Sequence, residues 1–326
     1  MHGIKRKKWT RELINQKKIH DRERINHYRN LVDKALLARD SNVYDLDSLK
    51  QTADILQLNP ELNVMWNYRR DIILHIGDSF SEEHWNRELI FIMTQLKRFP
   101  KVYWIWDHRI WTLNNHPGSS LKLWKAELDI VNKLLELDSR NYHGWHYRRI
   151  VIVKIQSHSS ENMSKEELDY VTLKINQNIS NFSAWHQRVQ VILSLIEGNE
   201  IDEKKQFFEN EVSYITNAMF TDAEDQSVWF YLKWFIKSDV VKESLGQKSY
   251  LKMLESLKKN IIAINDDDIA FSGKGNKRCL NTLINIENIQ KKFNPSLELH
   301  TKEYLQILIE VDPLRKNRYV HLLSNL

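Results

Sequence analysis

The chain has 326 residues, of which 42% are hydrophobic and 28% charged, and its net charge is +5. With 8 Gly, 5 Pro and one cysteine, Cys279, the composition disfavours a turn-rich β-sheet protein, a disulfide framework and a thiolate zinc cage within the chain. No apolar run approaches the roughly 18 residues of a membrane span or follows the basic N-terminus as a secretory signal would, so we expect a cytoplasmic protein of long helices.

The N-terminal segment is basic. Residues 1–39 carry 12 Lys/Arg and 4 Asp/Glu, a net charge of +8, which leaves −3 for the rest of the chain. We predict a helix from Trp9 to Arg39 at this end. Such an arm could bind nucleic acid or an anionic surface. Its basic and acidic residues are mixed, which is more typical of a solvated helix face, so we expect no nucleic-acid partner.

A repeat of about forty residues follows. Its five tryptophans are separated by 40, 39, 40 and 44 residues: Trp66, Trp106, Trp145, Trp185 and Trp229. Four of them begin a Trp-x-x-Arg pattern with Arg69, Arg109, Arg148 and Arg188, whereas in the fifth copy the basic residue moves by one position, to Lys233. This period excludes 34-residue tetratricopeptide and 33-residue ankyrin repeats and favours helical hairpins.

Each repeat is predicted to contain two helices. In the first copy, Asn59-Pro60 ends one helix and Gly77 ends the next; in the second copy, Pro117-Gly118 ends the hairpin. We predict a single domain, 1–326, with a helical arm over 1–40, repeats over 44–240 and degenerate closing repeats over 247–326. The residues Asp266-Asp267-Asp268 and the segment 272–276 are predicted to form a long loop in the last part.

The repeated tryptophans are first of all core residues. A tryptophan at one helical position in every repeat buries roughly 150–250 Å² each time. The arginine one turn later shares that face, so we expect it to hydrogen-bond carbonyl groups of the neighbouring helix or a carboxylate. The pattern therefore predicts an architecture and no chemistry.

A self-contained catalytic site is not apparent in the sequence. Neither a His-Glu-x-x-His helix nor a Gly-x-Ser-x-Gly elbow is present. The segment 271–275 superficially resembles a phosphate-binding loop, but Asp268 stands where that loop needs glycine. His143 and His146 are close enough to share a metal ion, but no third ligand is evident, so we expect no metal bound by this chain alone.

The sequence Asn141-Tyr-His-Gly-Trp145-His-Tyr-Arg148 is similar to the repeat of protein prenyltransferase α subunits. This resemblance implies an all-α fold, an α–α superhelix (crescent) of about six to seven antiparallel helical hairpins. In that family the α subunit wraps around a β subunit that holds zinc and the prenyl diphosphate pocket. A zinc-bound cysteine thiolate of the substrate protein attacks C1 of the isoprenoid, so the enzyme is active only as a heterodimer.

Three features resemble the Rab-type (type II) α subunits, and the length of 326 residues resembles their compact fungal form. Arg140 replaces the lysine typical of the shared farnesyl and type I subunit, and the chain opens with Met1-His-Gly-Ile-Lys5 and closes with Asp312-Pro-Leu-Arg315 followed by Tyr319. The resemblance implies transfer of geranylgeranyl from geranylgeranyl diphosphate to C-terminal cysteines of Rab proteins in vesicle transport. The implied partners are the β subunit, Rab GTPases and a Rab escort protein. The alternatives are the α subunit shared by farnesyltransferase and the type I enzyme, and a non-enzymatic scaffold.

The same resemblance implies three site residues. Arg140 and Tyr142 are expected on the diphosphate side of the active site, where positive charge stabilises the leaving group. His2 is a possible ligand to the zinc of the partner subunit, since catalytic zinc keeps one position open for exchange.

Overall fold

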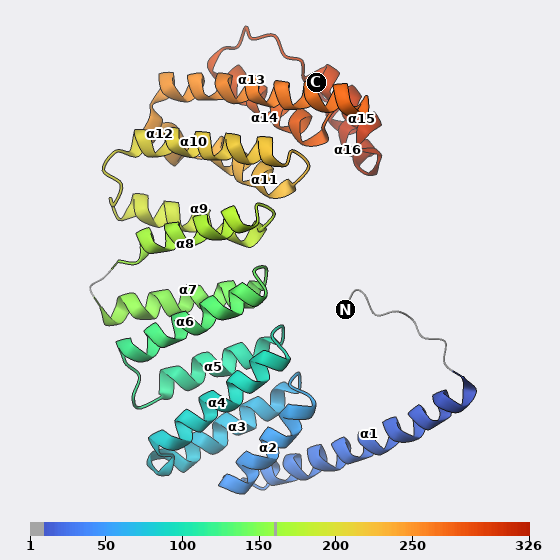
Figure 1. Cartoon of the computed structure of the whole chain (residues 1–326), viewed down its shortest axis with the longest axis vertical. Coiled ribbons are helices and arrows are strands. Elements are labelled where there is room, and N and C mark those ends of the chain that lie inside the picture. Colours follow the sequence, from blue (N-terminus) through green and yellow to red (C-terminus); the bar gives the residue numbers. More distant parts are fainter. Residues whose placement is uncertain (1–9, 160–161) are drawn as a thin grey trace. The chain divides into compact units, whose positions relative to one another are not determined.

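The computed structural model describes residues 10–159 and 162–326, which divide at Ser159 into two compact units that we describe separately. All regular secondary structure within these described residues is helical. The all-α class predicted from the repeat is thereby confirmed. Figure 1 shows the helices in chain order, from blue at the N-terminal end to red at the C-terminal end.

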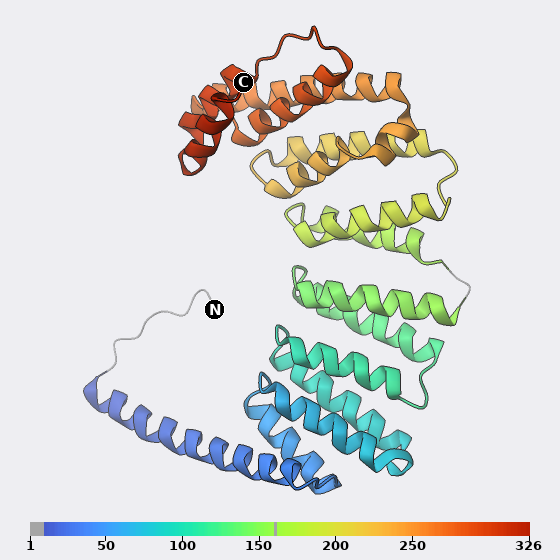
Figure 2. The ribbon, with the colours of Figure 1, turned by 180° about the vertical axis from the view of Figure 1, so that it is seen from behind.

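The first unit contains a long helix followed by three hairpins. Its helices are α1 (Arg11–Asp40), α2 (Leu46–Leu58), α3 (Asn63–Ile76), α4 (Glu82–Arg98), α5 (Tyr103–Asn115), α6 (Leu121–Leu137) and α7 (Tyr142–His158), with a short 3-10 helix, η1 (Gly77–Ser79), after α3. The hairpins pair α2 with α3, α4 with α5, and α6 with α7, and the second helices α3, α5 and α7 pack on one another in turn. Figure 2 shows this stacking from behind.

The second unit continues the plan with four hairpins. Its helices are α8 (Ser164–Gln177), α9 (Phe182–Glu197), α10 (Lys204–Thr221), α11 (Gln226–Phe235), α12 (Asp239–Leu245), α13 (Gln247–Ser272), α14 (Lys277–Phe293), α15 (Thr301–Val311), the 3-10 helix η2 (Pro313–Arg315) and α16 (Lys316–Leu323). The short helix α12 packs on α10 and α13, and α11 contacts both α9 and α14.

The long loop predicted around residues 266–276 is wrong. Helix α13 continues through Asp266 and its two following aspartates to Ser272, and the Asp268 carboxylate accepts a hydrogen bond from Asn276 Nδ2 at 2.7 Å. Gly273, in the left-handed conformation at φ 71°, ends it. Only residues 273–276 remain between α13 and α14.

The tryptophan of each repeat is buried in the core of its hairpin and also fixes the loop before its own helix. In all five copies the indole Nε1–H donates to the carbonyl oxygen six residues earlier, at 2.8–3.0 Å. Trp66 and Trp106 donate to the carbonyls of Pro60 and Pro100, so those prolines occupy a fixed place in the repeat. The ring thus fills the core while its one polar atom is satisfied within the same repeat.

The arginine of the pattern joins one hairpin to the next. The Nε atoms of Arg69, Arg109 and Arg188 donate at 2.7–2.8 Å to carboxylates on the first helix of the following hairpin: Glu88, Glu127 and Glu211. Each guanidinium also reaches the first helix of its own hairpin, for example the Leu49 carbonyl oxygen, 2.6 Å from Arg69 Nη1. Arg148 is buried as well and donates to Asn132 of α6. Sequence reasoning anticipated a carboxylate or a carbonyl partner but did not identify which glutamates.

Each of these carboxylates receives a second buried donor. Tyr147 and Tyr231 donate to Glu127 and Glu211 at 2.6 Å, and His108 Nε2 lies 2.8 Å from Glu88. Burial alone would raise the pKa of Glu88, but Arg69 and His108 outweigh it and lower that pKa to about 2. The hairpins are therefore joined by buried, hydrogen-bonded carboxylates, and the low pKa of Glu88 keeps that one ionised at pH 7.

The fifth repeat lacks this link. Leu232 takes the position of the arginine and is buried, whereas Lys233, the basic residue next to it, is exposed. Lys233 is therefore a surface residue and does not join hairpins in the way the arginines do.

Candidate functional site

Arg140 and Tyr142 lie at the N-terminal end of α7, on either side of a buried asparagine. Arg140 is exposed and the Tyr142 side chain is 67% exposed, whereas Asn141 and His143 are both buried. The alternation follows from the cap, because the Asn141 side-chain oxygen accepts hydrogen bonds from the backbone N–H groups of His143 and Gly144, at 3.1 and 3.4 Å. The cap turns the asparagine inward and leaves both of its neighbours at the surface.

The same asparagine ties α7 to the preceding hairpin. Its Nδ2 donates to the Pro100 carbonyl oxygen at 3.0 Å, the same oxygen that accepts from the Trp106 indole. Asp138 strengthens the junction: one of its carboxylate oxygens accepts from the backbone N–H of Arg140 at 3.2 Å, and the other lies 2.9 Å from Lys101 Nζ. Arg140, in the loop before α7, and Tyr142, the first residue of α7, are therefore held in place by bonds to the preceding hairpin.

Exposed aromatic rings mark the same position in successive repeats, three residues before the tryptophan. Tyr103 begins α5 and is 50% exposed, as is Phe182, which begins α9 in the second unit. Phe182 forms an edge-to-face contact with the exposed Phe230 at 6.0 Å between ring centroids. Sequence reasoning named Tyr142 alone; the shared register with the repeat tryptophan was the signal for the other two.

The electrostatics of this edge in the first unit favour an anion. Lys101 and Arg140 precede the N-termini of α5 and α7, where the helix dipole adds positive potential. Burial lowers the pKa of His143, so that imidazole is neutral at pH 7 and contributes no charge. Because Lys101 is paired with Asp138, the edge can offer the Arg140 guanidinium and the Tyr142 phenol to a negatively charged group.

The part of the chain that the structure describes contains no candidate metal-binding site. No group of three or more His, Cys, Asp or Glu side chains gathers there in a way that could hold a metal ion. His143 is buried and His146 exposed, so the two histidines do not present a common surface. Cys279 is buried, and burial raises the pKa of its thiol. His2 lies outside the described residues.

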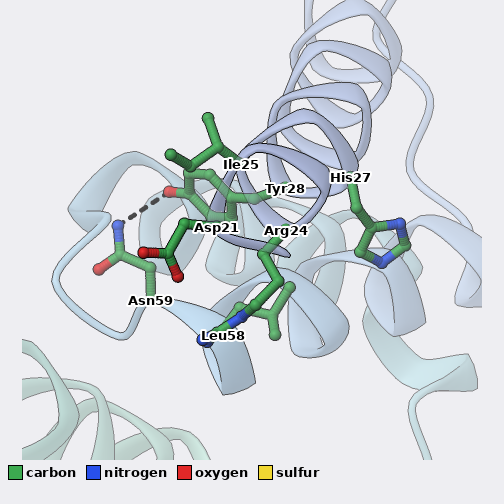
Figure 3. Close-up of a pocket in the computed structure, with 7 residues that line it drawn as sticks. All are labelled: Asp21, Arg24, Ile25, His27, Tyr28, Leu58 and Asn59. Atoms are coloured by element: carbon green, nitrogen blue, oxygen red, sulfur yellow. Dashed lines mark hydrogen bonds between the residues drawn. The ribbon is translucent and has the colours of Figure 1, made fainter. Parts of the chain in front are cut away.

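Helix α1 leaves its N-terminal part uncovered. Residues 10–20 are all exposed, and α1 packs on α2 near Tyr28. There a hollow of about 370 Å³ lies between α1 and the end of α2, where Asn59 Nδ2 donates to the Tyr28 hydroxyl at 2.8 Å (Figure 3). Asp21, Arg24 and His27 line it together with Ile25 and Leu58.

No helix in the described ranges is long and apolar enough to cross a membrane.

Known proteins share this architecture and sequence. The protein prenyltransferase alpha subunit repeat matches residues 85–116, 124–155, 164–195 and 208–239. A geranylgeranyl transferase type-2 subunit alpha from Saccharomyces cerevisiae is 53% identical over 99% of both chains, and its Candida albicans counterpart is 33% identical over 99% of this chain and 97% of that one. A solved Candida albicans protein geranylgeranyltransferase-I complexed with GGPP has the same fold, with a TM-score of 0.68 at 20% identity over 92% of this chain and 90% of that one. The chain belongs to the family of geranylgeranyl transferase type-2 α subunits.

Proposed function

We propose that this chain is the α subunit of a heterodimeric enzyme that acts in the cytoplasm on Rab proteins. The enzyme transfers geranylgeranyl from geranylgeranyl diphosphate to C-terminal cysteines of Rab proteins presented by an escort protein, a step in vesicle transport. The observation that carries the proposal is the 53% identity to the Saccharomyces cerevisiae type-2 α subunit over 99% of both chains.

The exposed apolar residues of α1 support the proposal that a partner subunit binds this helix. Leu13, Ile14, Ile19 and Ile25 are all more than one third exposed, and every residue from 10 to 20 is exposed. Isolated helices are marginally stable in water, and exposed apolar stretches mark protein interfaces. A β subunit that covers α1 would bury them.

The exposed side chains of Arg140 and Tyr142 fit the diphosphate side of the reaction. Negative charge builds on the diphosphate as the carbon–oxygen bond breaks, and fixed positive groups stabilise that state. In this proposal the guanidinium of Arg140 supplies such a charge and the Tyr142 hydroxyl a hydrogen bond. Zinc, bound by the β subunit, would hold the substrate cysteine as a thiolate, and His2 would occupy its open position in the absence of substrate.

Reconstitution tests the proposal. The chain is coexpressed with the type-2 β subunit of the same organism, and transfer of radiolabelled prenyl groups to a Rab protein is measured with and without escort protein. We expect geranylgeranyl transfer that requires both subunits and the escort protein, with either subunit alone as the control.

Two outcomes would contradict this expectation. Preferred use of farnesyl diphosphate, or of short C-terminal peptides without escort protein, would identify the subunit shared by farnesyltransferase and the type I enzyme. Association with the β subunit but no transfer to any substrate would favour a scaffold.

A further inference from the structure

The second unit contains a groove with a strongly cationic lining. It has a volume of about 430 Å³ and lies among α11, α14, α15, η2 and α16. One carboxylate, Asp312, lines it, against six cationic side chains: Lys233, Lys237, Lys277, Arg278, Arg315 and Arg318.

This concentration of charge does not reflect the composition of the unit. Residues 162–326 carry 21 Lys/Arg and 23 Asp/Glu, a net charge of −2. The fold nevertheless brings together cations from α11 and from helices more than forty residues later in the chain, with almost no acidic residues among them. Like charges gathered in this way repel one another, so the groove is electrostatically unfavourable while it is empty.

The cations are largely unpaired. Of these six cations, only Arg315 has an ion-pair partner among the described residues: its Nη1 lies 2.9 Å from an Asp312 carboxylate oxygen. That carboxylate is further occupied by the Tyr319 hydroxyl, which donates to it at 2.7 Å. The Nε atom of Arg278 is buried and has no hydrogen-bond partner in the described structure. A buried donor without an acceptor is unfavourable, so this atom is available to an acceptor that another molecule supplies.

Helix dipoles add to the positive potential. Lys277 and Arg278 are the first two residues of α14, and Arg318 lies in the first turn of α16. Cations at helix N-termini oppose the dipole and destabilise the helix. The charged form of Lys237 is also disfavoured, because burial and the neighbouring Lys233 and Lys292 lower its pKa. These placements are costly for stability and favourable for binding an anion.

The rest of the lining indicates what kind of anion fits. Apolar side chains form part of the lining: Trp229, Phe230, Ile236, Ile284, Leu305 and Leu322. Of these, Phe230 and Leu322 are well exposed. The amides of Asn281, Asn285 and Asn288 lie among them. A small inorganic anion would leave the apolar part unused, whereas a polypeptide segment with both acidic and apolar residues would contact all three kinds of surface.

We propose that this groove binds an acidic, partly apolar segment of the β subunit. The inference rests on the proposed heterodimer and names the part of the second unit that recognises its partner by charge. Continuity supports this occupant: Phe230 lines the groove and contacts Phe182, one of the exposed aromatic residues that begin the second helices of the repeats. Recognition by a cationic groove gives specificity and speeds association.

A pair of double variants tests the inference in the heterodimer. Lys237→Glu with Arg318→Glu reverses two exposed charges of the groove. The matched control, Lys248→Glu with Lys259→Glu, makes the same charge change at exposed positions of α13 outside the groove. Circular dichroism verifies that each variant is folded, and the dissociation constant for the β subunit is measured across a range of salt concentrations.

We expect the groove variant to bind the β subunit at least about tenfold more weakly in 0.1 M salt and with a shallower salt dependence, and the control to change by less than about threefold. Equal effects of the two variants, or no effect of either, would overturn the inference while leaving the heterodimer intact. If the wild-type chain does not associate with the β subunit at all, the proposed function fails instead.

Zero-length cross-linking of the wild-type heterodimer provides a test that requires no variant. A carbodiimide joins lysine amines to carboxylates only when the two are in contact. We expect Lys233, Lys237 or Lys277 to become linked to Asp or Glu residues of one β-subunit segment. Links from other lysines of this chain to the β subunit, but none from these three, would refute the inference.

Discussion

Replacing Glu88 with glutamine removes the charge from one link between hairpins and keeps its shape. In the wild type, Arg69 Nε donates to Glu88 at 2.7 Å and His108 Nε2 lies 2.8 Å away, all in the core of the first unit. Glutamine would leave the buried guanidinium without a counter-ion. Breaking a buried ion pair on one side costs about 3–5 kcal/mol, so we expect Glu88→Gln to lower the free energy of unfolding by that amount at pH 7.

The pKa of Glu88 gives a second route to this magnitude. The Arg69 and His108 contacts overcome the opposing effect of burial and lower this pKa from 4.5 to about 2, a difference equivalent to about 3 kcal/mol. Because the folded-state pKa lies below the unfolded one, this stabilisation is fully present above about pH 5. It is lost as the pH falls from 4.5 towards 2. The difference between wild type and Glu88→Gln should therefore shrink over that interval.

Urea unfolding followed by circular dichroism at several pH values measures the effect, and hydrogen exchange of α3 to α5 locates it. Glu83→Gln is the matched control, since Glu83 lies on the same helix and pairs with Arg87 at the solvent-exposed surface. We expect this control to change stability little. If Glu88→Gln is as stable as Glu83→Gln at pH 7, or if its deficit is the same at pH 3 as at pH 7, the buried carboxylate does not join the hairpins as we argue.

Three further variants test other parts of the chain. Trp145→Ala removes a buried ring and should cost about 3–5 kcal/mol, lowering the yield of heterodimer but not turnover per assembled enzyme; normal assembly of an inactive enzyme would contradict its place in the core. Arg140→Ala should lower kcat about 10–100-fold with a smaller effect on KM, and Arg140→Lys should recover part of the rate; an unchanged single-turnover rate in preassembled heterodimer would remove Arg140 from the active site. Asn141→Ala removes the cap of α7 and the bond to Pro100, and should cost about 1–2 kcal/mol in thermal or urea unfolding; stability equal to wild type would show that the cap does not hold this loop.

The architecture followed from the sequence because its signals are local. The tryptophan spacing and the breaks at Asn59-Pro60 and Gly77 predicted hairpins of about forty residues, and the helices end at those positions. The one clear error concerns Asp266-Asp267-Asp268, which local composition assigned to a loop. Helix α13 packs on α14, and Asn276 donates to the Asp268 carboxylate, so the aspartates remain helical despite their low helix propensity. Such contacts within a hairpin are not visible in the composition of a local window.

The sequence by itself determined the repeat, its core tryptophans and the resemblance to prenyltransferase α subunits. Only the tertiary structure decided which groups meet. It pairs Arg69 with Glu88 on the next hairpin, turns Asn141 inward while leaving Tyr142 exposed, and gathers Lys233 of α11 with Arg318 of α16 in one groove. The physical reason is one of range. Helix periodicity and caps act over a few residues, whereas buried ion pairs and surface charge depend on how successive hairpins stack, which no local pattern specifies.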